Sequence, residues 1–270
     1  MIVVLSEDIL GVSTLLNRTT ILENETVNGF NIYKVKYANT LPFIILVSGY
    51  GKVNIARALQ YVDTKYCIDK LIVTGNTGSL NATTAPIGSV GISTAGLQYD
   101  VDFTPLGAEP YALLNQEVYT YDADGNLITK AREAAIVVDE TVNTGLFATA
   151  DQFLANTTEA TALQTGTTAL FVDTSTSDAA QVAYFNQIPY VAIKGVSNYA
   201  GDDAVAEYNA NVNEANQNAN NIVYQLLMNL IGINEEINVT RCQNRTCNNQ
   251  QTIAWNGCCN PQNTYNRFWF

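Results

Sequence analysis

The hydrophobic pattern alternates short apolar runs with longer amphipathic stretches along most of the chain. The apolar runs predict buried strands, and they cover 1–5, 41–48, 71–73, 87–94, 142–150 and 189–193. Alternating apolar and polar residues predict one more strand over 29–37. Helical spacing predicts a helix near 55–62 and a final helix that Asp202 and Asp203 cap and that ends near Ile231. This alternation predicts an α/β fold with three α/β/α layers around a central mixed, mostly parallel sheet.

The stretch 169–201 is the centre of this pattern. It combines a strand, a helix start rich in Asp, Ser and Thr, the apolar strand 189–193 and a polar segment that follows it. Ligands of open α/β sheets bind just beyond the carboxyl ends of the strands. We therefore expect a polar loop after Ile193 that edges a pocket, and two glycine loops, 49–54 and 74–79, at other strand ends.

The charge balance restricts the partners of the chain. It carries 25 Asp and Glu against 13 Lys and Arg, so we expect no basic surface for nucleic acid or for an anionic membrane. No apolar run approaches the ~18 residues of a membrane span, and the short apolar N-terminus is expected to be a strand and not a signal peptide. Six Asn-x-Ser/Thr sequons leave open whether the protein is glycosylated and part of an extracellular or particle-surface assembly. The compartment stays undetermined.

Acid–base chemistry in this chain has to come from carboxylates. There is no histidine, so the commonest general base near neutral pH and the commonest zinc ligand are both missing. The acidic segment 122–126 has its glycine at the fourth position of a loop, where an EF-hand requires it at the sixth, and is expected to be a surface turn. We expect no metal and no cofactor.

A change of composition predicts two parts, a domain over 1–233 and a tail over 234–270 that is rich in Asn, Gln and Cys and closes on Phe268-Trp269-Phe270. Four of the five cysteines lie in this tail, with C-x4-C and C-C spacings that match no zinc pattern. Disulfides and free thiols both remain open. The aromatic end suggests that the tail docks onto a neighbour, which would make it an assembly device.

Six segments then carry a resemblance to a known family. In chain order they are SGYGKVN (48–54), TGNTG (74–78), IGSV (87–90), DVDFTPLG (100–107), ADQFL (150–154) and the stretch 169–201. Together they resemble the nucleoside phosphorylase superfamily, in particular its methylthioadenosine/adenosylhomocysteine nucleosidases and its purine and uridine phosphorylases. The resemblance covers about residues 1–231 and implies a phosphorylase/hydrolase-like fold, a homo-oligomer and a pocket for a purine nucleoside.

By the same resemblance, Phe153 and Leu154 would stack on the purine, and Leu106 would close a neighbouring subunit's pocket over the 5′ substituent. Lys194 stands where the family keeps an arginine in its anion or water site. Asn76, in the second glycine loop, would either contact substrate or only satisfy the start of a helix.

The reactive positions depart from the family pattern. Asn198 replaces the aspartate that protonates the leaving base, and an amide cannot deliver that proton. Thr174 and Ser175 replace a Met-Glu pair whose glutamate grips the ribose hydroxyls. At the family's water-activating glutamate an ungapped alignment places Val12, and Glu7 or Asp8 would serve only with a shifted loop.

These departures leave two functions. Val73 stands where phosphorylases keep a phosphate-binding arginine, which disfavours phosphorolysis. We expect a pseudoenzyme with degenerate catalytic residues and a structural, surface or assembly role, as in plant bark storage proteins, which are similar over the same segments. The alternative is an active purine nucleosidase or phosphorylase of altered specificity, since distant trimeric purine phosphorylases also use an asparagine at the base.

Overall fold

Ten strands form one mixed sheet in the computed structural model, which describes residues 1–38, 40–116 and 118–231. The predicted tail, its cysteines and the boundary at 233 lie outside the described residues. The strands are β1 (Ile2–Ser6), β2 (Thr20–Val27), β3 (Phe30–Lys36), β4 (Phe43–Val47), β5 (Lys70–Ser79), β6 (Val90–Gln98), β7 (Thr120–Asp122), β8 (Val142–Thr149), β9 (Phe171–Asp173) and β10 (Tyr190–Tyr199). The helices are α1 (Ser13–Asn17), α2 (Lys52–Tyr66), α3 (Gly125–Val137), α4 (Thr157–Thr167), α5 (Thr176–Phe185) and α6 (Ala204–Ile231), with 3-10 turns η1 (Leu10–Val12) and η2 (Thr104–Leu106).

Part of the sheet closes on itself. β10 pairs with both β5 and β6, β8 joins β6 to β9, and β9 pairs back with β5, so that five strands form a ring. From β5 the sheet continues outward through β1, β4 and β3 to β2 at its edge. Half of the ten pairings are parallel. The sheet is therefore mixed, as predicted, but not mostly parallel.

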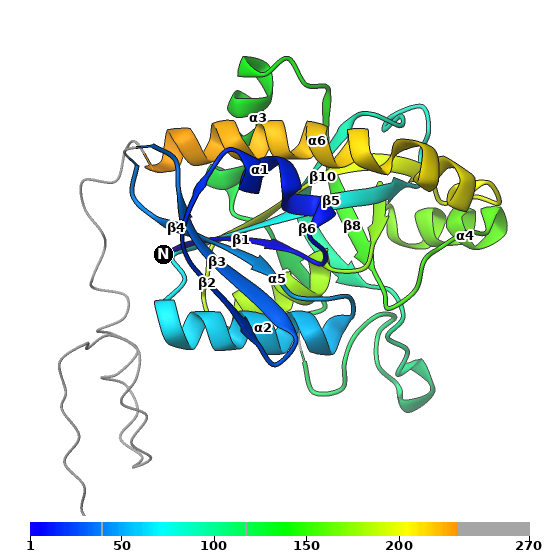
Figure 1. Ribbon diagram of the computed structural model, residues 1–270. Helices are drawn as coiled ribbons and strands as arrows, with labels where there is room; N and C mark the ends of the chain where they lie inside the picture. The colour runs from blue at the N-terminus through cyan, green and yellow to red at the C-terminus, as the bar shows by residue number, and fades with distance from the viewer. Residues whose placement is uncertain (39, 117, 232–270) are drawn as a thin grey trace, which may run out of the picture.

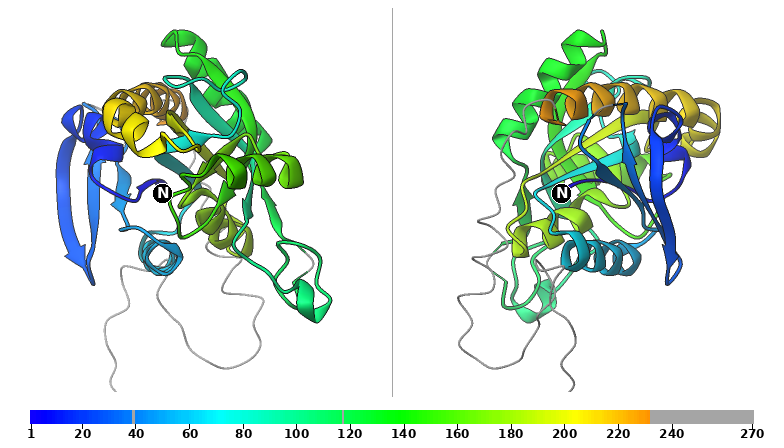
Figure 2. Two further views of the ribbon diagram at one scale, coloured as in Figure 1. Left: turned by 90° about the vertical axis from the view of Figure 1, so that its right-hand side faces the viewer. Right: turned by 60° about the vertical axis from the view of Figure 1, so that its left-hand side comes forward.

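Helices cover both faces of the sheet, which confirms the three layers (Figure 1). The two views of Figure 2 show α6 and α2 on opposite sides of the sheet. β1 contributes side chains to the cores on both faces of the sheet, because its successive side chains point to opposite faces. Val4 joins the core under α6, and Val3 joins the core over α2 and α5. A strand that is buried on both faces reads as a continuous apolar run, which is why it could be predicted.

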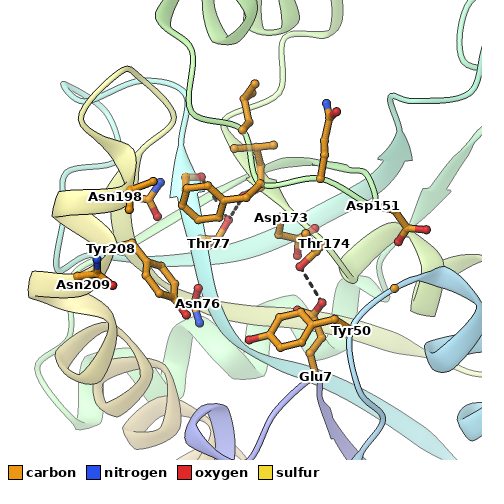
Figure 3. A pocket seen from close by; sticks show the side chains of 17 residues that line it. Glu7, Tyr50, Asn76, Thr77, Asp151, Asp173, Thr174, Asn198, Tyr208 and Asn209 are labelled. Carbon is orange, nitrogen blue, oxygen red and sulfur yellow. Dashed lines mark hydrogen bonds between the residues drawn. The ribbon is translucent and has the colours of Figure 1, made fainter.

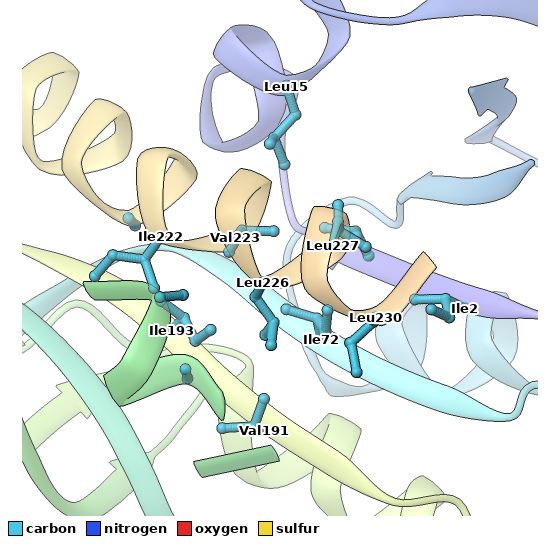
Figure 4. Close-up of a cluster of buried hydrophobic side chains, with 14 of the residues drawn as sticks. Ile2, Leu15, Ile72, Val191, Ile193, Ile222, Val223, Leu226, Leu227 and Leu230 are labelled. Atoms are coloured by element: carbon cyan, nitrogen blue, oxygen red, sulfur yellow. The ribbon is translucent and has the colours of Figure 1, made fainter. Parts of the chain in front are cut away.

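The core under α6 fixes how closely this helix approaches the sheet. Apolar side chains of its second half pack against β1, β5 and β10 (Figure 4); those labelled on the helix are Ile222, Val223, Leu226, Leu227 and Leu230. Nearer the pocket, the backbone of Ala215 passes so close to Gly195 of β10 that a methyl group there would overlap the Ala215 carbonyl. Glycine at position 195 is thus a packing requirement.

Two predicted loops are strands instead. Segment 74–79 belongs to β5 and segment 194–199 to β10, and the two pair in parallel from Gly75 opposite Lys194 to Ser79 opposite Tyr199. Their polar side chains suggested loops, but several of them are buried and bonded within the protein, as Lys194 is to Asp173 and Thr77 is to the Val172 carbonyl. The segment 122–126 also differs from a plain turn, since Asp124 caps α3 by accepting from the Leu127 N–H at 2.9 Å.

Candidate active site

A cavity of about 600 Å³ opens where several strands end (Figure 3). Strands β5, β9 and β10 contribute residues from their carboxyl-terminal ends. Glu7 follows β1 directly, Asp151 lies two residues after β8, and the first turns of α6 form one wall. The lining residues are Glu7, Tyr50, Gly51, Asn76, Thr77, Gly78, Asp151, Gln152, Phe153, Leu154, Val172, Asp173, Thr174, Asn198, Val205, Tyr208 and Asn209. The predicted pocket at the strand ends is therefore present, built from strands where a loop was expected.

Glu7 is the best-oriented carboxylate of this pocket. It follows β1, is 12% exposed, and its Oε1 accepts a hydrogen bond from the Thr174 hydroxyl at 2.7 Å. Its Oε2 lies 3.7 Å from the Lys194 ammonium, which approaches from behind the pocket wall. One oxygen is thereby held by a hydroxyl and the other faces a cation, so the carboxylate has a defined position.

Lys194 is completely buried and is bonded on three sides. Its Nζ lies 2.6 Å from Asp173 Oδ2 and donates to Ser175 Oγ at 2.5 Å, in addition to its approach to Glu7. A buried ammonium requires such partners, because burial without them costs several kcal/mol. Lys194 therefore holds the carboxylates of Glu7 and Asp173 in position from behind the pocket wall.

The charges of this cluster shift its ionisation in opposite directions. Burial raises the pKa of Glu7, and the nearby Lys194 offsets only part of that effect. Burial also acts to raise the pKa of Asp173. Lys194 and several hydrogen bonds outweigh this effect, so the pKa of Asp173 lies below the usual range. Burial acts to lower the pKa of Lys194, and its two carboxylate neighbours raise it instead. Asp173 and Lys194 form the charged pair, and Glu7 is the group that takes up a proton more readily than an ordinary glutamate.

The other end of the pocket is largely apolar. Phe153, which is 50% exposed, meets Tyr208 of α6 edge to face with ring centroids 5.6 Å apart. Leu154, Val172 and Val205 extend this surface. An apolar surface with two aromatic rings suits an aromatic ring system.

Asn198 supplies a polar group at this wall. Its Oδ1 accepts from the Ser197 hydroxyl at 2.8 Å, and its Nδ2 donates to the Tyr199 carbonyl at 3.1 Å. An amide nitrogen carries two N–H groups, so one is left to donate to a ligand. The side chain can hold an acceptor atom in place, but it has no proton to give up.

Beside the pocket, Lys52 lies among three acids. Its backbone N–H donates to Asp151 Oδ1 at 2.9 Å, and its ammonium pairs with Asp100 at 2.5 Å. Asp178, in the first turn of α5, is buried close by, and neither of its carboxylate oxygens has a hydrogen-bond partner among the described residues. Burial raises the pKa of Asp178 to about 8, with Lys52 opposing the effect.

Of the residues predicted for the site, five line the cavity: Asn76, Phe153, Leu154, Thr174 and Asn198. Ser175 and Lys194 were expected to meet a ligand and do not line it. Both are fully buried and bond each other behind the wall. Leu106 lies in η2, 68% exposed and away from this cavity; its expected contact is with another copy of the chain and stays a prediction.

The N-terminal expectation needs a correction. Val12, the residue that an ungapped alignment selects, is buried in the core under α6, whereas Glu7 lines the pocket. The signal was present in the sequence, since Glu7 is the first acidic residue after a buried strand, and strand ends form the site. The sequence gives no signal for Tyr208, because its spacing is that of an apolar position of the last helix, whose first turns face the cavity.

Comparison with known proteins identifies the family. A profile of the Phosphorylase superfamily matches residues 2–228. The chain belongs to this superfamily. The 5′-methylthioadenosine/S-adenosylhomocysteine nucleosidase of Staphylococcus carnosus is 27% identical over 217 residues, which cover 80% of this chain and 94% of the relative.

Two solved structures establish the same fold. The Neisseria meningitidis nucleosidase of that name, in complex with methylthio-immucillin-A, aligns with a TM-score of 0.80 and 23% identity, over 84% of this chain and 98% of that one. Futalosine hydrolase of Helicobacter pylori aligns with a TM-score of 0.80 and 19% identity, over 84% and 97%. The phosphorylase/hydrolase-like fold and the superfamily predicted from the motifs are confirmed.

No helix within the described part of the chain is long and apolar enough to cross a membrane. Among the same residues, no group of three or more His, Cys, Asp or Glu side chains is arranged to hold a metal ion.

Proposed function

We propose that the pocket binds a purine nucleoside and hydrolyses its N-glycosidic bond, with Glu7 as the general base that activates water. The observation that carries this proposal is the position of Glu7 on the pocket floor, fixed by Thr174 and Lys194, with a raised pKa. A general base works best when its pKa approaches the operating pH. The names of the relatives, nucleosidases and a hydrolase, favour this active alternative over a pseudoenzyme.

The charges of the pocket favour water over phosphate as the nucleophile. None of its lining residues is Lys or Arg, whereas three carry carboxylates, Glu7, Asp151 and Asp173. A phosphate dianion would meet this negative surface without a compensating cation, because both nearby ammonium groups are already paired. We therefore expect hydrolysis to proceed without phosphate.

The leaving base would be held at the apolar end. Its ring would lie against Phe153 and Leu154, and the free N–H of Asn198 would donate to a ring nitrogen. Since the amide cannot protonate the base, the proton has to come from solvent. Loss of a general acid lowers the rate by about 10²–10⁴, so we expect slow turnover.

Release of free base is the decisive measurement. The full chain is incubated with 5′-methylthioadenosine, adenosine and inosine, with and without phosphate, and the products are separated by liquid chromatography. We expect base release independent of phosphate, and a loss of about 10² or more in Glu7→Gln. Glu140→Gln, which changes a carboxylate bonded to Asn221 outside the pocket, is the matched control and should keep the wild-type rate. No release from any nucleoside would refute the hydrolase.

A second function, binding without cleavage in a structural or assembly role, is favoured by two residues. Position 198 holds an amide and position 175 a hydroxyl. By the resemblance to the family, these positions would carry the carboxyl groups that protonate the leaving base and bind the ribose hydroxyls. Saturable binding of a nucleoside to wild-type protein that never releases base would support this second function.

A further inference from the structure

Asp173, the carboxylate that shares the Lys194 ammonium with Glu7, has no capacity left for a ligand. Asp173 Oδ1 accepts from the Thr149 hydroxyl at 2.6 Å, and Oδ2 lies 2.6 Å from the Lys194 ammonium. The backbone N–H and the hydroxyl of Thr176 bond the same carboxylate. A carboxylate offers about four lone-pair sites, and all of them are used within the protein.

The hydroxyls beside it are also engaged. Ser175 Oγ is buried and bonded to the Lys194 ammonium at 2.5 Å, so it does not reach the cavity. Thr174 uses its proton on Glu7, which leaves only its neutral oxygen to accept from a ligand. If Glu7 holds the attacking water, as the proposed function requires, a sugar hydroxyl near Glu7 finds no charged acceptor among the described residues at this end.

From this we propose that the pocket does not select ribose over 2-deoxyribose, and that purine 2′-deoxynucleosides are substrates alongside the ribonucleosides. The inference rests on the proposed function for the place of the sugar, next to Glu7. A site built to bond a hydroxyl rejects the analogue that lacks it by about 10⁴–10⁵, because its own polar groups are then left unpaired. Here those groups are paired within the protein, so a missing 2′-hydroxyl leaves nothing unsatisfied.

The chemistry of the sugar favours the same outcome. Glu7 takes a proton from water, the water oxygen bonds to C1′, and the electrons of the C1′–N9 bond leave with the purine, which takes a proton from solvent. The sugar passes through a cation-like state, in which bonds to the 2-hydroxyl strengthen in enzymes that make them. A neutral hydrogen bond to Thr174 changes the rate by about tenfold at most, and without the electron-withdrawing 2′-hydroxyl the cation forms more easily.

Asp151 is the one lining carboxylate that could still oppose this inference. It is exposed at the rim and accepts from the Lys52 backbone N–H through Oδ1. Because Asp151 is exposed, a sugar hydroxyl would have to compete with solvent water for its carboxylate. The experiment therefore includes Asp151→Asn, which is expected to leave the ratio between the two sugars unchanged.

The test compares adenosine with 2′-deoxyadenosine on the full-length protein. We expect kcat/KM values within about tenfold of each other, and equal binding within the same factor by equilibrium dialysis. A ribonucleoside preference above about 100-fold would overturn the inference. If that preference disappeared in Asp151→Asn, Asp151 would be the carboxylate that binds the 2′-hydroxyl. Ser175→Glu, which adds a carboxylate at this end, is expected to raise the ribonucleoside preference; its folding is checked by circular dichroism, and the wild-type ratio decides the matter if it does not fold.

The two proposals fail in different ways. Release of adenine from adenosine but not from 2′-deoxyadenosine would support hydrolysis and refute the sugar inference. Equal binding of both nucleosides without release would do the reverse. Absence of binding to either would refute both.

Discussion

Replacing Asp178 by asparagine is expected to stabilise the protein, by an amount that depends on pH. The carboxylate is buried at the start of α5, neither oxygen has a hydrogen-bond partner among the described residues, and its pKa is raised to about 8. At pH 7 it is therefore mostly protonated in the folded state and ionised in the unfolded state. Asparagine has nearly the same shape as the protonated acid and never ionises, so it removes the cost of this protonation.

The size of the gain follows from the two pKa values. The ordinary aspartate pKa of 3.8 lies about 3 below pH 7, and each pH unit corresponds to about 1.4 kcal/mol, so the gain at pH 7 is about 4 kcal/mol. At pH 5 the same reasoning leaves about 2 kcal/mol. Between pH 4 and pH 8 the folded state binds a proton that the unfolded state has released. The contribution of Asp178 to stability therefore decreases as the pH rises through this window.

Urea unfolding followed by far-ultraviolet circular dichroism measures this difference at pH 5, 6, 7 and 8. Ser177→Ala is the matched control, because it removes a neighbouring buried hydroxyl that also lacks a partner but does not titrate. Its effect on the free energy of unfolding should be the same at every pH. A gain for Asp178→Asn that is equally independent of pH would refute the reasoning, and so would a gain that shrinks as the pH rises.

Four further predictions concern other parts of the chain. Lys194→Met should cost about 3–5 kcal/mol of unfolding free energy, since it leaves two carboxylates without their buried cation; a loss below 1 kcal/mol would contradict this. Gly195→Ala should prevent folding or lower the melting temperature sharply because α6 passes too close, whereas Gly125→Ala, with open space around it, should be tolerated. If Glu7 is the base, the acid limb of the rate–pH profile should lie above the ordinary glutamate pKa of 4.5, and a limb at or below that value would argue against it. Deleting 234–270 should reduce the mass measured by light scattering beyond the mass of the tail itself, if the tail mediates assembly.

The parts of the fold that could be predicted are those in which hydrophobic burial alone decides the structure. Ile55, Ala58 and Leu59 lie on one face of α2 and are buried, as their spacing indicates. β2, in contrast, was missed because it lies at the sheet edge with most of its side chains exposed, so its residues show no buried face. Its pairing with β3 decides the structure there.

The site was predicted in part for a similar reason. Phe153 and Asn198 follow from motif positions, and both line the pocket. The position of Glu7 depends on how the chain turns after β1. An ungapped alignment assumes one length for that turn, and it therefore selected Val12 and not Glu7. The burial of Ser175 could not be predicted either, since it depends on Lys194, whose ammonium reaches it from a strand across the ring.

Closure of the five-stranded ring has a consequence for how this site can change. The residues of β5 and β10 that line the pocket lie in the ladder between these two strands, and Gly78 also pairs with Val172 of β9, so their backbone cannot move without disturbing the ring. New specificity has to arise by exchange of single side chains at fixed positions, and insertions are excluded there. By the resemblance to the family motifs, the amide at position 198 of β10 would be a substitution of this kind. Directed evolution of this pocket should therefore begin with saturation of individual strand positions and leave the lengths of its connecting segments unchanged.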